Sequence, residues 1–176
     1  NFYTESLLRY WAWQSQPVRQ PVTPQQSLKR LEDYLAPLGV DPASYELQDA
    51  SGLSRQNLVS PESLVALLEV AQKWQYGEER DRAKSQTFLN SLAVAGEAGT
   101  LKRRFVDTPV SGKFRGKTGT LRGTVTLAGI LEMPDQSSAL VSIMANQSDQ
   151  STTRLRTTVD AMILQLDQSL KCSTPR

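Results

Sequence analysis

The sequence predicts an α+β fold, in which a helical half is followed by a three-stranded antiparallel meander and a packed C-terminal helix. Apolar residues recur at helical spacing through most of residues 2–92. Three strand-like runs between residues 113 and 146 are joined by connections so short that neighbouring strands must be antiparallel. A helical stripe returns over residues 155–166, and this last helix most simply packs on the meander.

The first two expected helices are separated by a proline-rich connector. Leucine and aromatic side chains at helical spacing predict helices over residues 2–14 and 25–38. Prolines at positions 17, 21 and 24 indicate an extended segment between them. Gly39 is the expected C-cap of the second helix, because glycine adopts the left-handed conformation there without strain.

A polar, glycine-containing loop over residues 49–61 precedes the third expected helix. Ser60 is typical of an N-cap and Pro61 of a first helical position, so this helix should begin there. Its apolar stripe continues toward Gly77, where we expect the helix to stop.

The sheet half follows a charged segment at 78–84, a short expected helix over 83–92 and a small-residue loop over 93–100. The expected strands are residues 113–120, 124–133 and 138–146. They are joined by turns at 121–123 and 134–137. The middle strand carries a long apolar run, as expected of a central strand that is covered on both faces.

Composition excludes several kinds of site. Without histidine, the chain contains no Ser-His-Asp triad, no Cys-His dyad and no His-ligated metal, and its single cysteine forms no internal disulfide or thiolate cluster. A net charge of +2 is too small to indicate nucleic acid. The basic residues within 102–122 either attract anions or form a solvated rim, and they lack the interleaved aromatic residues that stack on bases. No apolar run approaches about 18 residues, so we expect no transmembrane segment.

The tetrapeptide Lys-Thr-Gly-Thr, residues 117–120, could bind a peptide that ends in a free carboxylate. Lys117 supplies a fixed positive charge, and the Thr118 hydroxyl can donate to the same carboxylate. Gly119 lacks Cβ, so another backbone can approach an open strand edge and pair with it. The N–H of Thr120 could face a reacting carbonyl oxygen. The alternative is an ordinary strand with an exposed lysine and a glycine that flattens it.

Several blocks of sequence resemble the class C penicillin-binding proteins, which are D-alanyl-D-alanine carboxypeptidase/endopeptidases of peptidoglycan metabolism. The blocks cover, in the family's order, residues 1–8, 49–57, 95–105, 116–121 and 127–129. On this resemblance Asn1 is the last residue of a Ser-x-Asn motif, and residues 117–119 are the Lys-Thr-Gly motif. Ala50 and Ala93 are mild departures, standing where the family has Gly and Pro. The resemblance extends over nearly all 176 residues.

The resemblance implies that residues 1–176 are the C-terminal part of a single serine β-lactamase/penicillin-binding-protein-like domain. The family's nucleophile is a Ser followed three residues later by Lys, and none of the seven lysines has Ser at that position before it. We therefore expect the nucleophile on an N-terminal segment of the same protein, upstream of Asn1. The whole protein is then expected to be a serine-type carboxypeptidase, and this chain alone to be inactive.

The family's mechanism implies a role for each matched residue. Asn1 would orient the substrate amide, Lys117 and Thr118 would hold the terminal carboxylate, and the Thr120 N–H would form half of an oxyanion hole. No metal or organic cofactor is implied. The expected partners are peptidoglycan stem peptides ending in D-Ala-D-Ala and β-lactams, in the periplasm or another extracytoplasmic compartment of a bacterium. Two alternatives stay open: an inactive peptide-binding fragment or module of this fold, and a hydrolase of β-lactams or simple esters.

The other polar residues of these blocks are expected to be structural. Ser51 and Ser54 should bond to local backbone, and Asp49 should fix the loop through an Asx-type turn. Arg103 and Arg104 should be surface or ion-paired residues.

Overall fold

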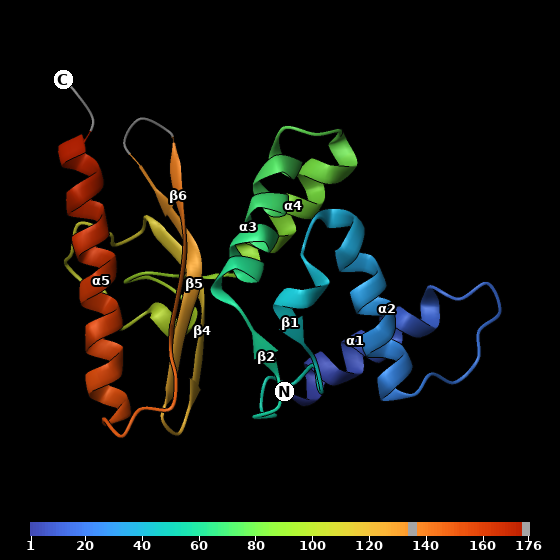
Figure 1. Ribbon diagram of the computed structural model, residues 1–176. Coiled ribbons are helices and arrows are strands. Elements are labelled where there is room, and N and C mark those ends of the chain that lie inside the picture. Colours follow the sequence, from blue (N-terminus) through green and yellow to red (C-terminus); the bar gives the residue numbers. More distant parts are fainter. Residues whose placement is uncertain (134–136, 174–176) are drawn as a thin grey trace. The chain divides into compact units, whose positions relative to one another are not determined.

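The computed structural model describes residues 1–133 and 137–173 (Figure 1). Its contacts divide the chain into two compact units, Asn1–Leu67 and Leu68–Arg176, and each is described by itself. The first unit is mainly helical, and the second joins helices to an antiparallel sheet, so the predicted α+β class is confirmed.

The first unit begins with two packed helices, α1 (Phe2–Gln14) and α2 (Pro24–Leu35). Trp11 and Tyr34 meet edge to face between them, with ring centroids 5.6 Å apart. α2 ends three residues before the predicted end because residues 36–38 form a 3₁₀ turn. Gly39 caps this turn at φ +87°, the left-handed conformation predicted for it.

The first unit also contains a two-stranded antiparallel ladder. β1 (Tyr45–Glu46) pairs antiparallel with β2 (Leu58–Val59), on either side of the loop that contains residues 49–57. The sequence did not predict these strands, since two residues are too few to show an alternating pattern. α3 (Pro61–Gln75) then begins where predicted, and the Ser63 N–H donates to the Ser60 hydroxyl at 3.2 Å.

α4 (Glu79–Ser91) begins four residues earlier than predicted. The expected charged segment therefore belongs largely to this helix. Glu79 and Asp81 lie in its first turn, where acidic side chains are favoured by the helix dipole, and Asp81 pairs with Lys84 at 2.8 Å.

The sheet has the order β3-β4-β5-β6, and all of its neighbouring strands are antiparallel. Its strands are β3 (Ala93–Val94), β4 (Phe114–Leu121), β5 (Thr124–Glu132) and β6 (Ser138–Ala145). The three predicted strands are confirmed to within one residue at each end. β3 was expected to be part of a loop. Of the turn predicted at 134–137, residues 134–136 lie outside the described residues.

The main core lies between the sheet and α5 (Thr152–Ser173), which runs along one face of the sheet (Figure 1). Phe114, Leu127, Leu131 and Ile163 are fully buried there, so the predicted packing of the last helix on the meander is confirmed. Coverage of β5 is less even than predicted. Its α5-facing residues are buried, whereas on the opposite face only Ile130 is.

Candidate active site

β4 carries Lys117, Thr118, Gly119 and Thr120 at the outer edge of the sheet. The neighbouring strand β3 pairs with β4 only at Arg115 and Gly116. Beyond Gly116, none of the strands in the described residues continues the ladder on this side. The sheet edge next to the Lys-Thr-Gly-Thr segment is therefore open for an extended peptide.

The backbone groups that face this edge belong to alternate residues. The Phe114 carbonyl accepts a hydrogen bond from the Ala95 N–H at 2.9 Å, so the main-chain groups of Phe114 point toward the β3 side. In an antiparallel strand the N–H and C=O groups of every second residue point to the same side. Those of Thr118 and Thr120 therefore point to the open edge as well, which is the orientation that the predicted role of the Thr120 N–H requires.

The Lys117 side chain folds back toward the same edge. Its ammonium donates to the Thr118 carbonyl at 2.8 Å, and the side chain is exposed. Within residues 1–133 and 137–173 no carboxylate pairs with it. Successive side chains on a strand point to opposite faces, yet this bend brings the charge next to the Thr118 backbone. The charge is therefore available to an anion bound along the edge.

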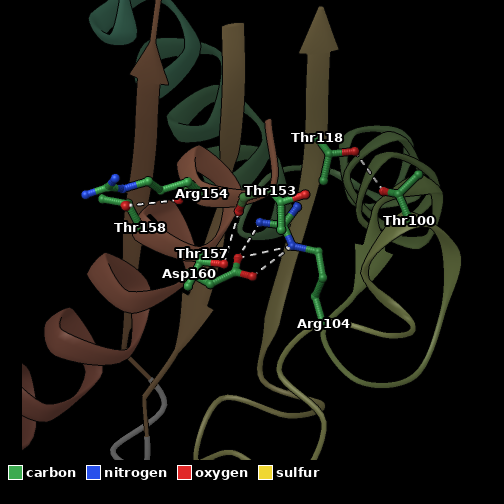
Figure 2. Close-up of polar contacts among 8 residues, drawn as sticks. All are labelled: Thr100, Arg104, Thr118, Thr153, Arg154, Thr157, Thr158 and Asp160. Carbon is green, nitrogen blue, oxygen red and sulfur yellow. Dashed lines mark hydrogen bonds and ion pairs between the residues drawn. The ribbon is translucent and has the colours of Figure 1, made fainter. Parts of the chain in front are cut away.

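The Thr118 hydroxyl contacts a residue that the sequence did not single out. It donates to the hydroxyl of Thr100 at 2.9 Å, as the close-up shows (Figure 2). Thr100 lies on a 3₁₀ turn, η3 (Gly99–Leu101), eighteen residues earlier in the chain. The signal that could have found it is the Gly-Thr-Leu sequence within the third matched block.

Packing within the sheet favours a residue without a side chain at position 119. A Cβ at this position would lie 2.3 Å from the hydroxyl oxygen of Thr126 on the paired strand β5. The glycine therefore makes room for the sheet itself, in addition to any role in admitting a peptide backbone.

The loop that carries Thr100 is tied to the core and to α5. The Gly96 N–H donates to the Arg104 carbonyl at 2.8 Å, and Leu101 is fully buried. The Arg104 Nε lies 3.1 and 3.2 Å from the two carboxylate oxygens of Asp160 on α5, and its terminal nitrogen also bonds to Asp160 (Figure 2). Arg104 is thus ion-paired and Arg103 is exposed, as predicted.

Removal of this ion pair should measurably destabilise the second unit. Arg104 and Asp160 are only 11% and 24% exposed, so Arg104→Met leaves a mostly buried carboxylate without its partner. We expect a loss of about 2 kcal/mol in the free energy of urea unfolding. As a matched control, Lys73→Met breaks the exposed pair with Glu69 and should cost less than about 0.5 kcal/mol. Equal effects of the two substitutions would contradict a structural role for Arg104.

Asn1 lies in the first unit, at the N-cap of α1. Its carbonyl accepts a hydrogen bond from the Thr4 hydroxyl at 2.8 Å, while its side chain makes no capping bond and is exposed. Since Lys117 belongs to the second unit, the catalytic role of Asn1 stays a prediction.

The loop over residues 49–57 is organised around the Asp49 carboxylate. Its Oδ1 accepts from the Gly52 N–H and from the Asn57 amide, each at 2.9 Å, and its Oδ2 accepts from the Ser54 N–H at 2.9 Å. Asp49 thus fixes the loop as predicted, but it reaches the third and fifth residues along the chain, whereas an Asx turn reaches the second.

The two serines of this loop bond to local backbone, which confirms their predicted structural role. The Ser51 hydroxyl accepts from the Leu53 N–H, and the Ser54 hydroxyl accepts from the Gln56 N–H, both at 3.1 Å. Neither has a lysine or histidine beside it in the sequence that would make it a nucleophile.

The loop should loosen in acid. Burial alone would raise the pKa of Asp49, but hydrogen bonds from Asn57, Gly52, Ser51 and Ser54 outweigh it and hold this pKa below its ordinary value of 3.8. The stabilisation is therefore complete above pH 3.8 and is lost as the pH falls through the lower folded value. The amide proton shifts of Gly52 and Ser54, followed by NMR, should titrate with a midpoint below 3.8 and not titrate in Asp49→Asn. A midpoint at or above 3.8 would contradict this prediction.

The described residues contain neither a membrane-spanning helix nor a cluster of metal ligands. Among the described residues, no helix has the length and apolar character needed to cross a bilayer. In the same residues, no group of three or more His, Cys, Asp or Glu side chains is placed to hold a metal ion.

Comparison with known proteins assigns the chain to a family. The model of the D-Ala-D-Ala carboxypeptidase 3 (S13) family matches residues 1–169. A penicillin-sensitive carboxypeptidase A from Dictyostelium discoideum is 30% identical over 98% of this chain and 33% of its own length. A D-alanyl-D-alanine carboxypeptidase from Actinomadura sp. is 39% identical over 60% of this chain and 19% of its own length.

A solved structure supports the same assignment. Penicillin-binding protein 4 from Haemophilus influenzae superposes with a TM-score of 0.70 at 26% identity, over 85% of this chain and 31% of that protein. A second structure of that protein is a complex with a β-lactam. The chain thus spans a third or less of each of these relatives. With its family match over nearly the whole length, the chain belongs to the D-Ala-D-Ala carboxypeptidase 3 (S13) family.

Proposed function

We propose that this chain is the C-terminal part of a serine-type D-alanyl-D-alanine carboxypeptidase/endopeptidase that acts on peptidoglycan stem peptides and is acylated by β-lactams. The observation that carries the proposal is the open edge of β4, which the backbone groups of Thr118 and Thr120 face. The Lys117 ammonium contacts the Thr118 carbonyl there and pairs with no carboxylate in the described part of the chain. Family membership supplies the reaction class.

The substrate peptide would lie extended along this edge. Its terminal carboxylate would accept hydrogen bonds from the Lys117 ammonium and the Thr118 hydroxyl. The scissile carbonyl would then lie close to the Thr120 N–H, which stabilises the negative charge that develops on its oxygen. Asn1 would orient the substrate amide.

The nucleophile would come from an upstream Ser-x-x-Lys segment of the same protein. Its serine attacks the D-Ala-D-Ala carbonyl while the neighbouring lysine takes the serine proton, the amide C–N bond breaks, and the terminal D-Ala leaves with a proton on its nitrogen. Water then hydrolyses the acyl-serine. Since peptidoglycan lies outside the cytoplasm, the whole protein would act in the periplasm or another extracytoplasmic compartment.

Labelling with a fluorescent penicillin tests the proposal. Protein expressed from the complete gene should be labelled and should release D-Ala from a peptide ending in D-Ala-D-Ala. Replacing the serine of the upstream Ser-x-x-Lys segment with Ala should abolish both. A complete gene without this segment, or no labelling although the segment is present, would overturn the proposal.

The isolated chain should have no peptidase turnover. It contains no Ser-x-x-Lys sequence and no histidine, so nothing in it can form the acyl-enzyme. Purified residues 1–176, shown by circular dichroism to be folded, should release no D-Ala above background. Measurable release would mean that the nucleophile lies within these residues.

A further inference from the structure

Thr118 has two polar contacts: its hydroxyl bonds to that of Thr100, and its carbonyl accepts a hydrogen bond from the Lys117 ammonium. We propose that Thr100 is a positioning residue of the carboxylate site, whose hydroxyl orients that of Thr118 toward the bound carboxylate. This inference rests on the proposed function and adds to it a residue from a different segment of the chain.

Two hydroxyls that bond to each other leave one O–H proton free for a ligand. In the structure Thr118 donates to Thr100 across 2.9 Å. A carboxylate beside Lys117 accepts but cannot donate, so it favours the reverse arrangement, in which Thr100 donates to Thr118 and Thr118 donates to the carboxylate. In this chain of bonds each donor strengthens the next, because an oxygen that accepts a hydrogen bond becomes a better donor.

The support of Thr100 is rigid. Gly99 has φ +61°, and a Cβ there would lie 2.9 Å from the Cβ of Ala93 on β3, so the turn sits directly against that strand. On its other side Leu101 is fully buried, and the ion pair between Arg104 and Asp160 ties the same loop to α5 (Figure 2). A hydroxyl held in this way keeps its partner in one orientation at little entropic cost on binding.

Folding alone gives little reason for this contact. Thr100 is exposed and Thr118 half-buried, and a hydrogen bond between neutral groups near solvent contributes little net stability. The contact involves Thr118, which directly follows Lys117 in the sequence, and this position points to a role in binding.

The test compares benzylpenicillin with its methyl ester, which lacks the free carboxylate, as acylating agents of the protein from the complete gene. Thr100→Val should lower the second-order acylation rate by benzylpenicillin about 5-fold and leave that by the ester unchanged, since only the carboxylate uses the hydroxyl pair. Thr100→Ser keeps the hydroxyl and should restore the rate. Thr108→Val is the matched control, because it removes a hydroxyl from the same loop whose only bond among the described residues is to the Phe105 carbonyl, and both rates should stay unchanged.

The outcomes separate this inference from the proposed function. Thr118→Val should itself weaken the preference for benzylpenicillin over its ester. If Thr118→Val does so while Thr100→Val does not, or if Thr100→Val slows both agents equally, the positioning role of Thr100 is wrong and the proposed function stands. If neither agent acylates the wild-type protein, or Thr118→Val leaves the preference intact, the proposed carboxylate site is wrong.

Discussion

The substitution Lys117→Met should lower the rate at which penicillin acylates the complete protein by about 100-fold or more. Losses of this size are typical when a group that stabilises charge in an active site is removed. Methionine keeps an unbranched side chain but lacks the ammonium. In the described residues, the Lys117 ammonium is the positively charged group that contacts the Thr118 carbonyl, and the substitution removes it. A charge-assisted hydrogen bond to the penicillin carboxylate would disappear with it.

Lys113→Met is the matched control for charge. Lys113 is exposed, directly precedes β4, and its removal changes the net charge by the same amount. We expect its acylation rate to stay within about 2-fold of wild type, because a solvated charge away from the binding edge is screened by salt. A loss of less than 10-fold in Lys117→Met, or an equal loss in both variants, would show that Lys117 does not bind the carboxylate. Acylation is followed by stopped-flow competition against a fluorescent penicillin.

Gly129→Ala should destabilise the second unit by about 3 kcal/mol, the upper part of the range for an overpacked core. Gly129 on β5 pairs directly with Gly116 on β4. A Cβ at position 129 would lie 2.1 Å from the Arg115 carbonyl oxygen and 2.7 Å from the Cα of Gly116. Both are backbone atoms, which cannot turn aside as a side chain can. The backbone of β4 would therefore have to shift at Gly116, one residue before Lys117.

Gly77→Ala adds the same methyl group in the same unit at a tolerant position. The added Cβ would lie 3.1 and 3.3 Å from the Cβ and Oδ2 of Asp81, and a shift of a few tenths of an ångström at this half-buried side chain accommodates it. Thermal and urea unfolding of this variant should differ from wild type by less than about 0.5 kcal/mol. If Gly129→Ala unfolds at the wild-type urea concentration, the close approach of β4 and β5 does not limit stability. In the complete protein, Gly129→Ala should also slow penicillin acylation.

The sequence predicts those elements whose signals are local. The meander was found because three long strands alternate with short turns, and α3 because Ser60 and Pro61 form a start signal. β1, β2 and β3 were missed because two-residue strands exist only through their partners. The early start of α4 was missed because its first turn is polar, and polar residues alone do not distinguish a helix from a loop.

The candidate site shows the same division. Residues 117–120 could be predicted as candidates because they are contiguous in the sequence and form one motif on one strand. The contact of Thr118 with Thr100 could not, because it depends on how the loop folds over β4. The packing that requires glycine at position 119 could not be predicted either. It depends on the pairing of β4 with β5, which places Thr126 opposite Gly119.

The shortness of β3 has a consequence for the behaviour of the molecule at high concentration. Beyond Gly116, the outer edge of β4 pairs with no strand of the described residues, and such an edge can recruit a neighbouring copy as readily as a ligand, which is how aggregation often starts. Where two copies pair antiparallel with their Lys117 residues near the middle of the joined segments, the two ammonium groups would repel each other and oppose the pairing. The residue that would attract a carboxylate thereby also discourages self-association.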